Sequence, residues 1–305
     1  MVNGDPIMAR RVYKAAMRGV IVALVLAASA TATAPAPPRE GAFFDSNHVQ
    51  IHYVDKGQGA PVVLVHGFTG SFERHWQAPG VAQALESAGY RVIGIDCRGH
   101  GESGKPRDPR QYGLEMVRDV VRLLDHLHVD RAHVVGVSMG GWIASQLLVG
   151  YPDRIRTVTL VGAGWEGEDL KELSSQMLAL ADGFDRKDAS ALIRGVTSGQ
   201  NPPSDQEVAA MSASLFARNE PAVLAAIARA LVPLADIPAE RLRAATAPVL
   251  AIVGEHDAHN REAVKRMNRV LPALEVVEIP GATHATTPRP SAPFIVAFLD
   301  KHRRD

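Results

Sequence analysis

The sequence predicts an α/β protein built on a mostly parallel β-sheet that is flanked by helices. Two observations lead to this prediction: short apolar runs rich in β-branched residues recur along the chain, and segments with helical spacing of apolar residues separate them. Such runs, bounded by Gly, Pro or Asp, are typical of strands buried on both faces. Their alternation with helices indicates parallel strands joined by crossover helices.

The expected elements follow one another from residue 49 onward. The first strand alternates apolar and polar side chains, because its inner and outer faces differ. The expected strands are residues 49–53, 61–65, 91–95, 133–137, 155–161, 248–253 and 274–279. The expected helices, each with apolar residues every three or four positions, are residues 81–88, 114–127, 140–149, 262–271 and 294–302.

One interval, between Val161 and Pro248, breaks this alternation. It contains no convincing strand, and its apolar residues keep helical spacing, as in Val223, Ile227 and Leu231. One interpretation is a helical extension of the core. We favour the other, a lid over the carboxyl edge of the sheet, because ligand crevices in open α/β sheets lie at that edge.

The first 34 residues have the layout of a secretory signal peptide. Four basic residues precede the apolar run 20–28, and a string of alternating Ala and Ser or Thr follows it. The run is shorter than the roughly 20 apolar residues that span a bilayer. We therefore expect an exported protein, periplasmic or secreted. The alternatives are an uncleaved N-terminal anchor that would associate with a membrane, and a hydrophobic tail without a role. Translation from Met8 would shorten the charged segment before the apolar run to a length more usual for a signal peptide.

Composition excludes several classes of partner and site. The 33 basic residues balance 33 acidic ones, and without clustered Lys and Arg we expect no nucleic-acid partner. Removal of residues 1–34 takes away four basic residues and one acidic residue, which leaves a formal charge of −3. The single cysteine, Cys97, excludes an internal disulfide and a Cys-rich zinc site. We expect Cys97 to be a passive thiol.

The segment Gly136-Val137-Ser138-Met139-Gly140 is a G-x-S-x-G sequence in a strand-turn-helix context. The motif alone is weak, but this context is the one that a nucleophile elbow requires. Small residues at Gly136 and Gly140 avoid clashes across the strained turn. The hydroxyl of Ser138 would then lie at the N-terminus of a helix, where anionic intermediates are stabilised.

A serine hydroxyl needs a base to take its proton. His284 follows the strand 274–279, and Asp257 directly follows the strand 248–253. Both positions lie at the edge that exposes Ser138, and the order Ser, Asp, His is the one expected for this elbow. We therefore expect His284 to be the base and Asp257 its orienting carboxylate. The rivals, for which a solvated loop position is favoured, are Glu255, His256 and His259.

Acyl transfer also needs donors for a developing oxyanion. The strand 61–65 ends in His66-Gly67-Phe68-Thr69-Gly70, where the glycine lets the chain turn back. We expect the backbone N–H groups of Phe68 and Met139 to be the two donors. His66 is expected to be a structural hydrogen-bonding residue, and the polar turn 96–103 to be loop architecture.

Taken together, these motifs resemble the α/β-hydrolase superfamily over nearly all of residues 43–303. The matching segments are the HGF turn, D-x-R-G-H-G-x-S, GVSMGG, GEHD and GATH, in family order. The resemblance implies an eight-stranded sheet with a helical cap at 163–245, inserted after the sixth strand between core segments 35–162 and 246–305. It also implies the triad Ser138, Asp257 and His284, which occur in this order along the chain. Epoxide hydrolases and haloalkane dehalogenases of this superfamily carry Asp at the elbow, so Ser138 speaks against both.

With epoxide hydrolases and haloalkane dehalogenases set aside, the sequence resembles the esterase, lactonase and non-haem perhydrolase group of this superfamily. We therefore expect a serine hydrolase that cleaves a carboxylic ester or lactone through an acyl-enzyme on Ser138. No metal or organic cofactor is required. Trp142 and Trp165 are expected to line a pocket for a small, apolar ester. The same triad would also serve an acyltransferase or a perhydrolase, and a ligand-binding protein that retains the triad without turnover is a further alternative.

Overall fold

The computed structural model describes residues 41–199 and 201–303. The predictions of a signal peptide or an anchor within residues 1–34 lie outside these described residues. Among the described helices, none is both long and apolar enough to cross a membrane.

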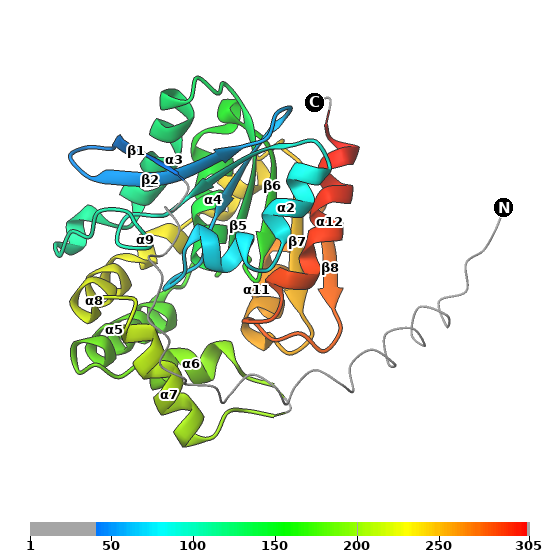
Figure 1. Ribbon diagram of the computed structural model, residues 1–305. Helices are drawn as coiled ribbons and strands as arrows, with labels where there is room; N and C mark the ends of the chain where they lie inside the picture. The colour runs from blue at the N-terminus through cyan, green and yellow to red at the C-terminus, as the bar shows by residue number, and fades with distance from the viewer. Residues whose placement is uncertain (1–40, 200, 304–305) are drawn as a thin grey trace. The chain divides into compact units, whose positions relative to one another are not determined.

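An eight-stranded sheet runs through the described chain, in the order β1-β2-β4-β3-β5-β6-β7-β8 (Figure 1). Strand β2 pairs antiparallel with both of its neighbours, and all other neighbours pair in parallel. The predicted fold class is therefore confirmed. The strands are β1 Ala42–Asp45, β2 Gln50–Lys56, β3 Pro61–Val65, β4 Arg91–Ile95, β5 Ala132–Val137, β6 Ile155–Val161, β7 Val249–Gly254 and β8 Glu275–Ile279.

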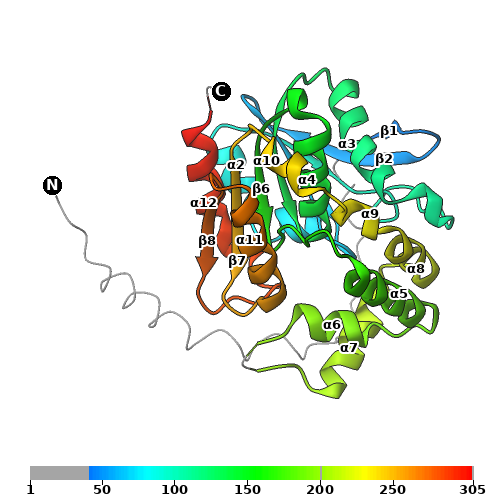
Figure 2. The ribbon, with the colours of Figure 1, turned by 180° about the vertical axis from the view of Figure 1, so that it is seen from behind.

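Helices cover both faces of the sheet. On one face α2 and α12 lie side by side, and α3, α4 and α11 cover the other face (Figures 1 and 2). These helices and the short helical turns of the core are η1 Glu73–Gln77, α2 Val81–Ser87, η2 Pro109–Gln111, α3 Leu114–His126, α4 Met139–Gly150, η3 Pro152–Arg154, α11 Ala258–Val270 and α12 Pro288–Lys301.

Successive side chains of the central strands enter two separate hydrophobic clusters. In β3, Val63 and Val65 pack with α3 and α4, whereas Val62 and Leu64 pack with α2 and α12. This alternation is what the period of two in a strand requires. It explains why β3 and its neighbours are apolar along their whole length, as expected for strands buried on both faces.

Every element between β6 and β7 in the described residues is a helix, as expected for this interval. Helices α5 to α8 gather at one end of the core, where α5 packs against α8 and α6 against α7, whereas α9 contacts α4 and α10 contacts α11 (Figures 1 and 2). Their bounds are α5 Lys171–Asp185, α6 Ser190–Val196, α7 Asp205–Phe216, α8 Pro221–Ala230, α9 Val232–Ala235 and α10 Ala239–Arg243.

Two helices begin earlier than the apolar spacing predicts, and each start has a local cause. Helix α11 begins at Ala258 because Asp257 caps it, its side chain accepting a hydrogen bond from the Asn260 N–H. Helix α12 begins at Pro288, since proline fits the first helical position, where its missing N–H needs no acceptor. Strand β1 was also not expected; it pairs with β2 along the edge of the sheet.

Candidate active site

Ser138 lies at the sharp turn between β5 and α4, at the carboxyl edge of the sheet. Its backbone has φ 53° and ψ −118°, a conformation that is costly for a residue with a side chain. The turn is held on both sides: the Ser138 N–H donates to Val161 O at 2.9 Å, and Ser138 O accepts from Gly141 N–H at 2.7 Å. The hydroxyl-bearing residue is partly exposed, whereas Met139 beside it is buried.

Glycines are required on both sides of this turn. A Cβ at Gly136 would lie 2.0 Å from Gly140 O, and a Cβ at Gly140 would lie 2.2 Å from Val65 O. The start of α4 therefore lies directly against the end of β3. Because Met139 is the first residue of α4, its N–H has no acceptor within the helix. The Met139 N–H and the turn that follows β3 thus come from segments in contact.

Asp257 and His284 form a hydrogen-bonded pair at the same edge. Asp257 follows β7, and His284 lies in the loop between β8 and α12; the two strands pair in parallel, with Gly254 opposite Ile279. His284 Nδ1 lies 2.7 Å from Asp257 Oδ2. Asp257 is 5% exposed, and the His284 side chain is 15% exposed. A buried carboxylate in this position fixes the orientation of the imidazole and stabilises its protonated form.

Asn260, in the first turn of α11, holds the carboxylate from the other side. Its Nδ2 lies 2.9 Å from Asp257 Oδ1 and 3.0 Å from Oδ2. Burial by itself raises the pKa of Asp257, but the hydrogen bonds from His284 and Asn260 outweigh it and leave that pKa below its ordinary value. Asp257 is therefore the charged partner of His284. Asn260 was not predicted as a site residue, although its position three residues after a capping Asp is a recognisable signal.

Gly162, the first residue after β6, connects this pair to Ser138. A Cβ on Gly162 would lie 3.1 Å from His284 Nδ1 and 3.5 Å from Asp257 Oδ2. The preceding residue, Val161, accepts the hydrogen bond from Ser138 N–H. Ser138 and the Asp257–His284 pair thus flank the same strand end, as expected for residues at the carboxyl edge of a parallel sheet.

The segment Gly67–Gly70 after β3 is a tight turn beside Ser138. The Gly70 N–H donates to Gly67 O at 3.1 Å, and Thr69 between them has φ 62°. A Cβ on Gly67 would lie 3.2 Å from Ser138 Cβ. Gly67 therefore lies close to Ser138, and the next residue is Phe68, whose N–H is an expected oxyanion donor.

Two helices between β6 and β7 contact the site. The Phe68 ring packs edge-on against Phe184 of α5, with ring centroids 5.7 Å apart. The Ala285 N–H, next to His284, donates to Val196 O at the end of α6 at 3.0 Å. The helical interval thus touches both the turn after β3 and the loop of His284.

The two expected pocket residues occupy different positions. Trp142 lies in the first turn of α4 after Ser138, and Trp165 follows β6; both are partly buried against the larger hydrophobic cluster. The indole N–H of Trp165 donates to Ile237 O at 2.8 Å, which ties the beginning of the helical interval to its end.

The remaining polar residues near these loops have structural partners. His66 Nε2 accepts from Cys97 N–H at 2.9 Å, in agreement with its expected structural role. Glu255 Oε2 accepts from Gly281 N–H at 2.7 Å, and His259 Nε2 lies 3.2 Å from Glu166 Oε1. Within the described chain, no three His, Cys, Asp or Glu side chains are arranged to hold a metal ion.

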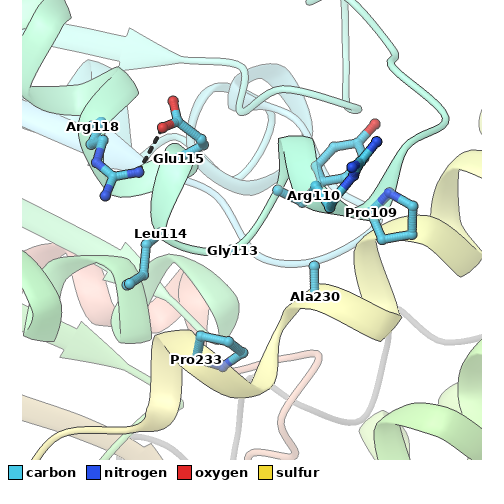
Figure 3. A pocket seen from close by; sticks show the side chains of 9 residues that line it. Pro109, Arg110, Gly113, Leu114, Glu115, Arg118, Ala230 and Pro233 are labelled. Atoms are coloured by element: carbon cyan, nitrogen blue, oxygen red, sulfur yellow. Dashed lines mark hydrogen bonds and ion pairs between the residues drawn. The ribbon is translucent and has the colours of Figure 1, made fainter.

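A separate pocket of about 350 Å³ lies between the start of α3 and the α8–α9 region (Figure 3). Its two arginines are already paired, Arg110 with Asp108 and Arg118 with Glu115. Gly113 at its base has no room for a side chain, since a Cβ would lie 2.7 Å from Ala230 O. None of the expected site residues lines this pocket.

Comparison with known proteins places this fold in a family. The family model of the alpha/beta hydrolase fold matches residues 60–286, and the chain belongs to this family. The bifunctional epoxide hydrolase 2 of Sus scrofa is 38% identical over 112 residues, which cover 36% of this chain and 20% of that protein. A 2-hydroxy-6-oxo-6-phenylhexa-2,4-dienoate hydrolase of Burkholderia cepacia is 37% identical over 127 residues, which cover 41% and 43%.

The matched stretches therefore span less than half of these curated relatives. A solved structure, described as Est816, an N-acyl homoserine lactone degrading enzyme, is similar over 84% of this chain and 100% of its own, with a TM-score of 0.67 and 28% identity.

Proposed function

We propose that this chain is a serine hydrolase that cleaves a carboxylic ester or lactone through an acyl-enzyme on Ser138. The observation that carries the proposal is the position of Ser138: it lies in a strained elbow beside Gly162, whose other neighbours are the hydrogen-bonded Asp257 and His284. Nucleophile, base and orienting carboxylate are the three groups that such a reaction needs.

The proposed reaction has two half-steps. His284 Nε2 takes the hydroxyl proton of Ser138 as the oxygen attacks the ester carbonyl, and the N–H groups of Phe68 and Met139 stabilise the resulting oxyanion. The C–O bond to the alcohol then breaks, and the alcohol leaves with the proton from His284. In the second half-reaction His284 takes a proton from water as the water oxygen attacks the acyl-serine carbonyl. The bond from that carbonyl to Ser138 Oγ then breaks, His284 gives its proton to Ser138 Oγ, and the acid is released.

The nucleophile also argues against epoxide hydrolysis, the activity named for one of the relatives. An epoxide opened by a serine oxygen would give an ether, which has no carbonyl for water to attack, so turnover would stop. A carboxylate nucleophile gives an ester that water can cleave, and Ser138 is not a carboxylate. An ester or a lactone, in contrast, gives an acyl-serine that is hydrolysed. The similarity to a lactone-degrading enzyme makes N-acyl homoserine lactones a first substrate to test.

We further propose that residues 163–245 form a cap over the site. The proposal is supported by Phe184 against Phe68 and by Val196 against the loop of His284. Apolar helix faces at that position would suit a small apolar ester. Trp142 and Trp165 stay predictions as its lining, and export through residues 1–34 stays a prediction as well.

The test compares the purified full chain with Ser138→Ala. We expect the wild type to hydrolyse p-nitrophenyl esters or lactones and to be labelled rapidly by a fluorophosphonate probe, and we expect Ser138→Ala to lose both by at least about 10³-fold. The matched control is Ser145→Ala, which makes the same change at a buried position of α4, the helix that follows Ser138; it should keep both.

Full hydrolysis by Ser138→Ala would contradict the proposal. An unlabelled, inactive wild type would favour the ligand-binding alternative. Product analysis with added alcohol or hydrogen peroxide separates the remaining alternatives, since an acyltransferase or a perhydrolase would pass the acyl group to these acceptors in preference to water.

A further inference from the structure

His75 lies against the turn that follows β3, although no sequence motif indicates a role for it in the site. It belongs to the short helical turn η1, and its Nδ1 lies 3.0 Å from the Gly67 nitrogen, whose N–H donates to it. Its ring fills the space that side chains at Gly67 and Gly70 would need: a Cβ would lie 3.2 Å from His75 Cε1 at Gly67 and 2.4 Å from it at Gly70.

The same glycine therefore separates His75 from the proposed nucleophile. The Cβ position of Gly67 is 3.2 Å from His75 Cε1 and also 3.2 Å from Ser138 Cβ. Any shift of the Gly67 backbone toward or away from His75 changes its distance to Ser138. The Phe68 N–H, one residue later, would move with it.

The turn needs such a partner, because its backbone is strained. Thr69 has φ 62°, in the left-handed region, where a β-branched residue is an outlier. Strain of this kind costs on the order of 1–3 kcal/mol and persists only where the surroundings hold it. Two hydrogen bonds are available to hold it, the Gly70 N–H to Gly67 O and the Gly67 N–H to His75 Nδ1.

The hydrogen bond also fixes the tautomer of His75. A backbone N–H is the donor, so Nδ1 must be unprotonated and the neutral ring carries its proton on Nε2. Burial lowers the pKa of His75 to about 3, and charge on His66, Arg74 and His284 acts in the same direction. The ring therefore stays neutral, and Nδ1 stays an acceptor, through the physiological pH range.

The short helix that carries His75 is itself firmly anchored. Trp76, the next residue, is fully buried in the smaller hydrophobic cluster. The His75 N–H donates to Ser71 O at 3.1 Å, and the Ala78 N–H donates to Glu73 O at 2.7 Å. The Nδ1 lone pair is thus presented from a fixed element, which a flexible surface side chain would not provide.

We propose that His75 is a positioning residue for the proposed oxyanion site: its Nδ1 holds the Gly67 N–H and thereby fixes the strained turn and the Phe68 amide against Ser138. This inference rests on the proposed function of Ser138. His75 acts through the turn, with no direct part in the transfer of protons.

Substitution of His75 by Asn and by Gln distinguishes the role of Nδ1 from that of Nε2. In His75→Asn the side-chain oxygen can lie near the place of Nδ1 and accept from Gly67 N–H, whereas in His75→Gln the amide reaches the place of Nε2. His75→Leu removes both groups. The measurements are kcat and KM for a p-nitrophenyl ester, the Ki of a trifluoromethyl ketone whose serine adduct carries an oxyanion, and the melting temperature.

We expect His75→Leu and His75→Gln to lower kcat by about 10- to 100-fold and to raise Ki by a similar factor, with KM changed less than about 3-fold. This loss is below the roughly 10²–10³-fold loss for removal of an oxyanion donor, because the Phe68 amide is displaced and not removed. His75→Asn should stay within about 3-fold of the wild type in both.

The reverse order, with His75→Gln active and His75→Asn impaired, would overturn the proposal, and so would folded variants that all keep the wild-type kcat and Ki. A second measurement does not depend on activity. The ¹⁵N shifts of His75 in the full chain should show a neutral ring with the proton on Nε2 down to pH 5, and a protonated Nδ1 would overturn the proposal. If the wild type is neither labelled at Ser138 nor active while His75 shows this tautomer, the proposed function fails and the hydrogen bond stands.

Discussion

His100 is enclosed in the core, with its ring packed edge-on against the rings of His66 and Phe68. It is fully buried, its Nδ1 lies 3.1 Å from Arg98 O, and its Nε2 has no hydrogen-bond partner among the described residues. Burial lowers the pKa of His100 to about 3, with a smaller effect in the same direction from charge on His66. The folded protein therefore keeps this ring neutral where the unfolded chain protonates it.

The sign and the size of the effect follow from proton linkage. Below its unfolded pKa of 6.5, His100 binds a proton only in the unfolded state, so the free energy of unfolding falls as the pH falls from 6.5 toward 3. Each pH unit in this window costs about 1.4 kcal/mol. Between pH 8 and pH 5, His100 alone should therefore remove about 2 kcal/mol of stability.

The assay is urea unfolding of the wild type and of His100→Phe at pH 8, 6.5 and 5. The absolute stability of the variant also includes the lost hydrogen bond to Arg98 O, but that difference does not depend on pH. We expect the wild type to lose about 2 kcal/mol more than His100→Phe between pH 8 and pH 5. His128→Asn is the control, because it replaces a histidine that is exposed in the folded protein. Parallel curves for the wild type and His100→Phe would show that folding does not lower the pKa of His100.

Two further predictions concern the candidate site. Gly136→Ala places a Cβ 2.0 Å from a backbone oxygen, so we expect urea unfolding to show that the free energy of unfolding falls by more than about 3 kcal/mol. Gly150→Ala, where the added Cβ meets open space, should stay within about 1 kcal/mol of the wild type. Equal stabilities of the two variants would contradict the tight elbow. Asn260→Ala removes the two contacts of Nδ2 with Asp257, so kcat on an ester should fall about 10-fold or more, since a hydrogen bond to a charged group contributes about 1.5–3 kcal/mol. An unchanged kcat would show that His284 alone holds the carboxylate.

Much of the fold and of the candidate site could be predicted because the signals are local. Each central strand is a continuous apolar run, and parallel strands present their carboxyl ends at one edge. Asp257 and His284 each come soon after such a run, and Ser138 lies between a strand and a helix. The position of these three residues at one edge of the sheet could therefore be predicted without knowing how the helices pack.

The residues that the sequence did not indicate depend on contacts between distant or irregular segments. His75 contacts Gly67 because a short helical turn, with a hydrogen bond from Ala78 N–H to Glu73 O, follows the strained loop. The spacing of apolar residues does not indicate such a turn. Gly162 has a role only because His284, more than a hundred residues later, packs on it. Neither relation could be read from spacing along the chain.

The candidate site depends on how closely backbone segments approach one another. The missing side chain of Gly67 lets the turn touch Ser138, that of Gly140 lets α4 touch the end of β3, and that of Gly162 admits His284. A methyl group at any of these positions would separate the proposed nucleophile, Ser138, from its proposed oxyanion donors or from its proposed base. A displacement of about 1 Å can cost an enzyme 10²-fold in rate. The three glycines therefore set the spacing of the candidate site, and His75 accepts the hydrogen bond from the Gly67 N–H of the turn in which Thr69 has φ 62°.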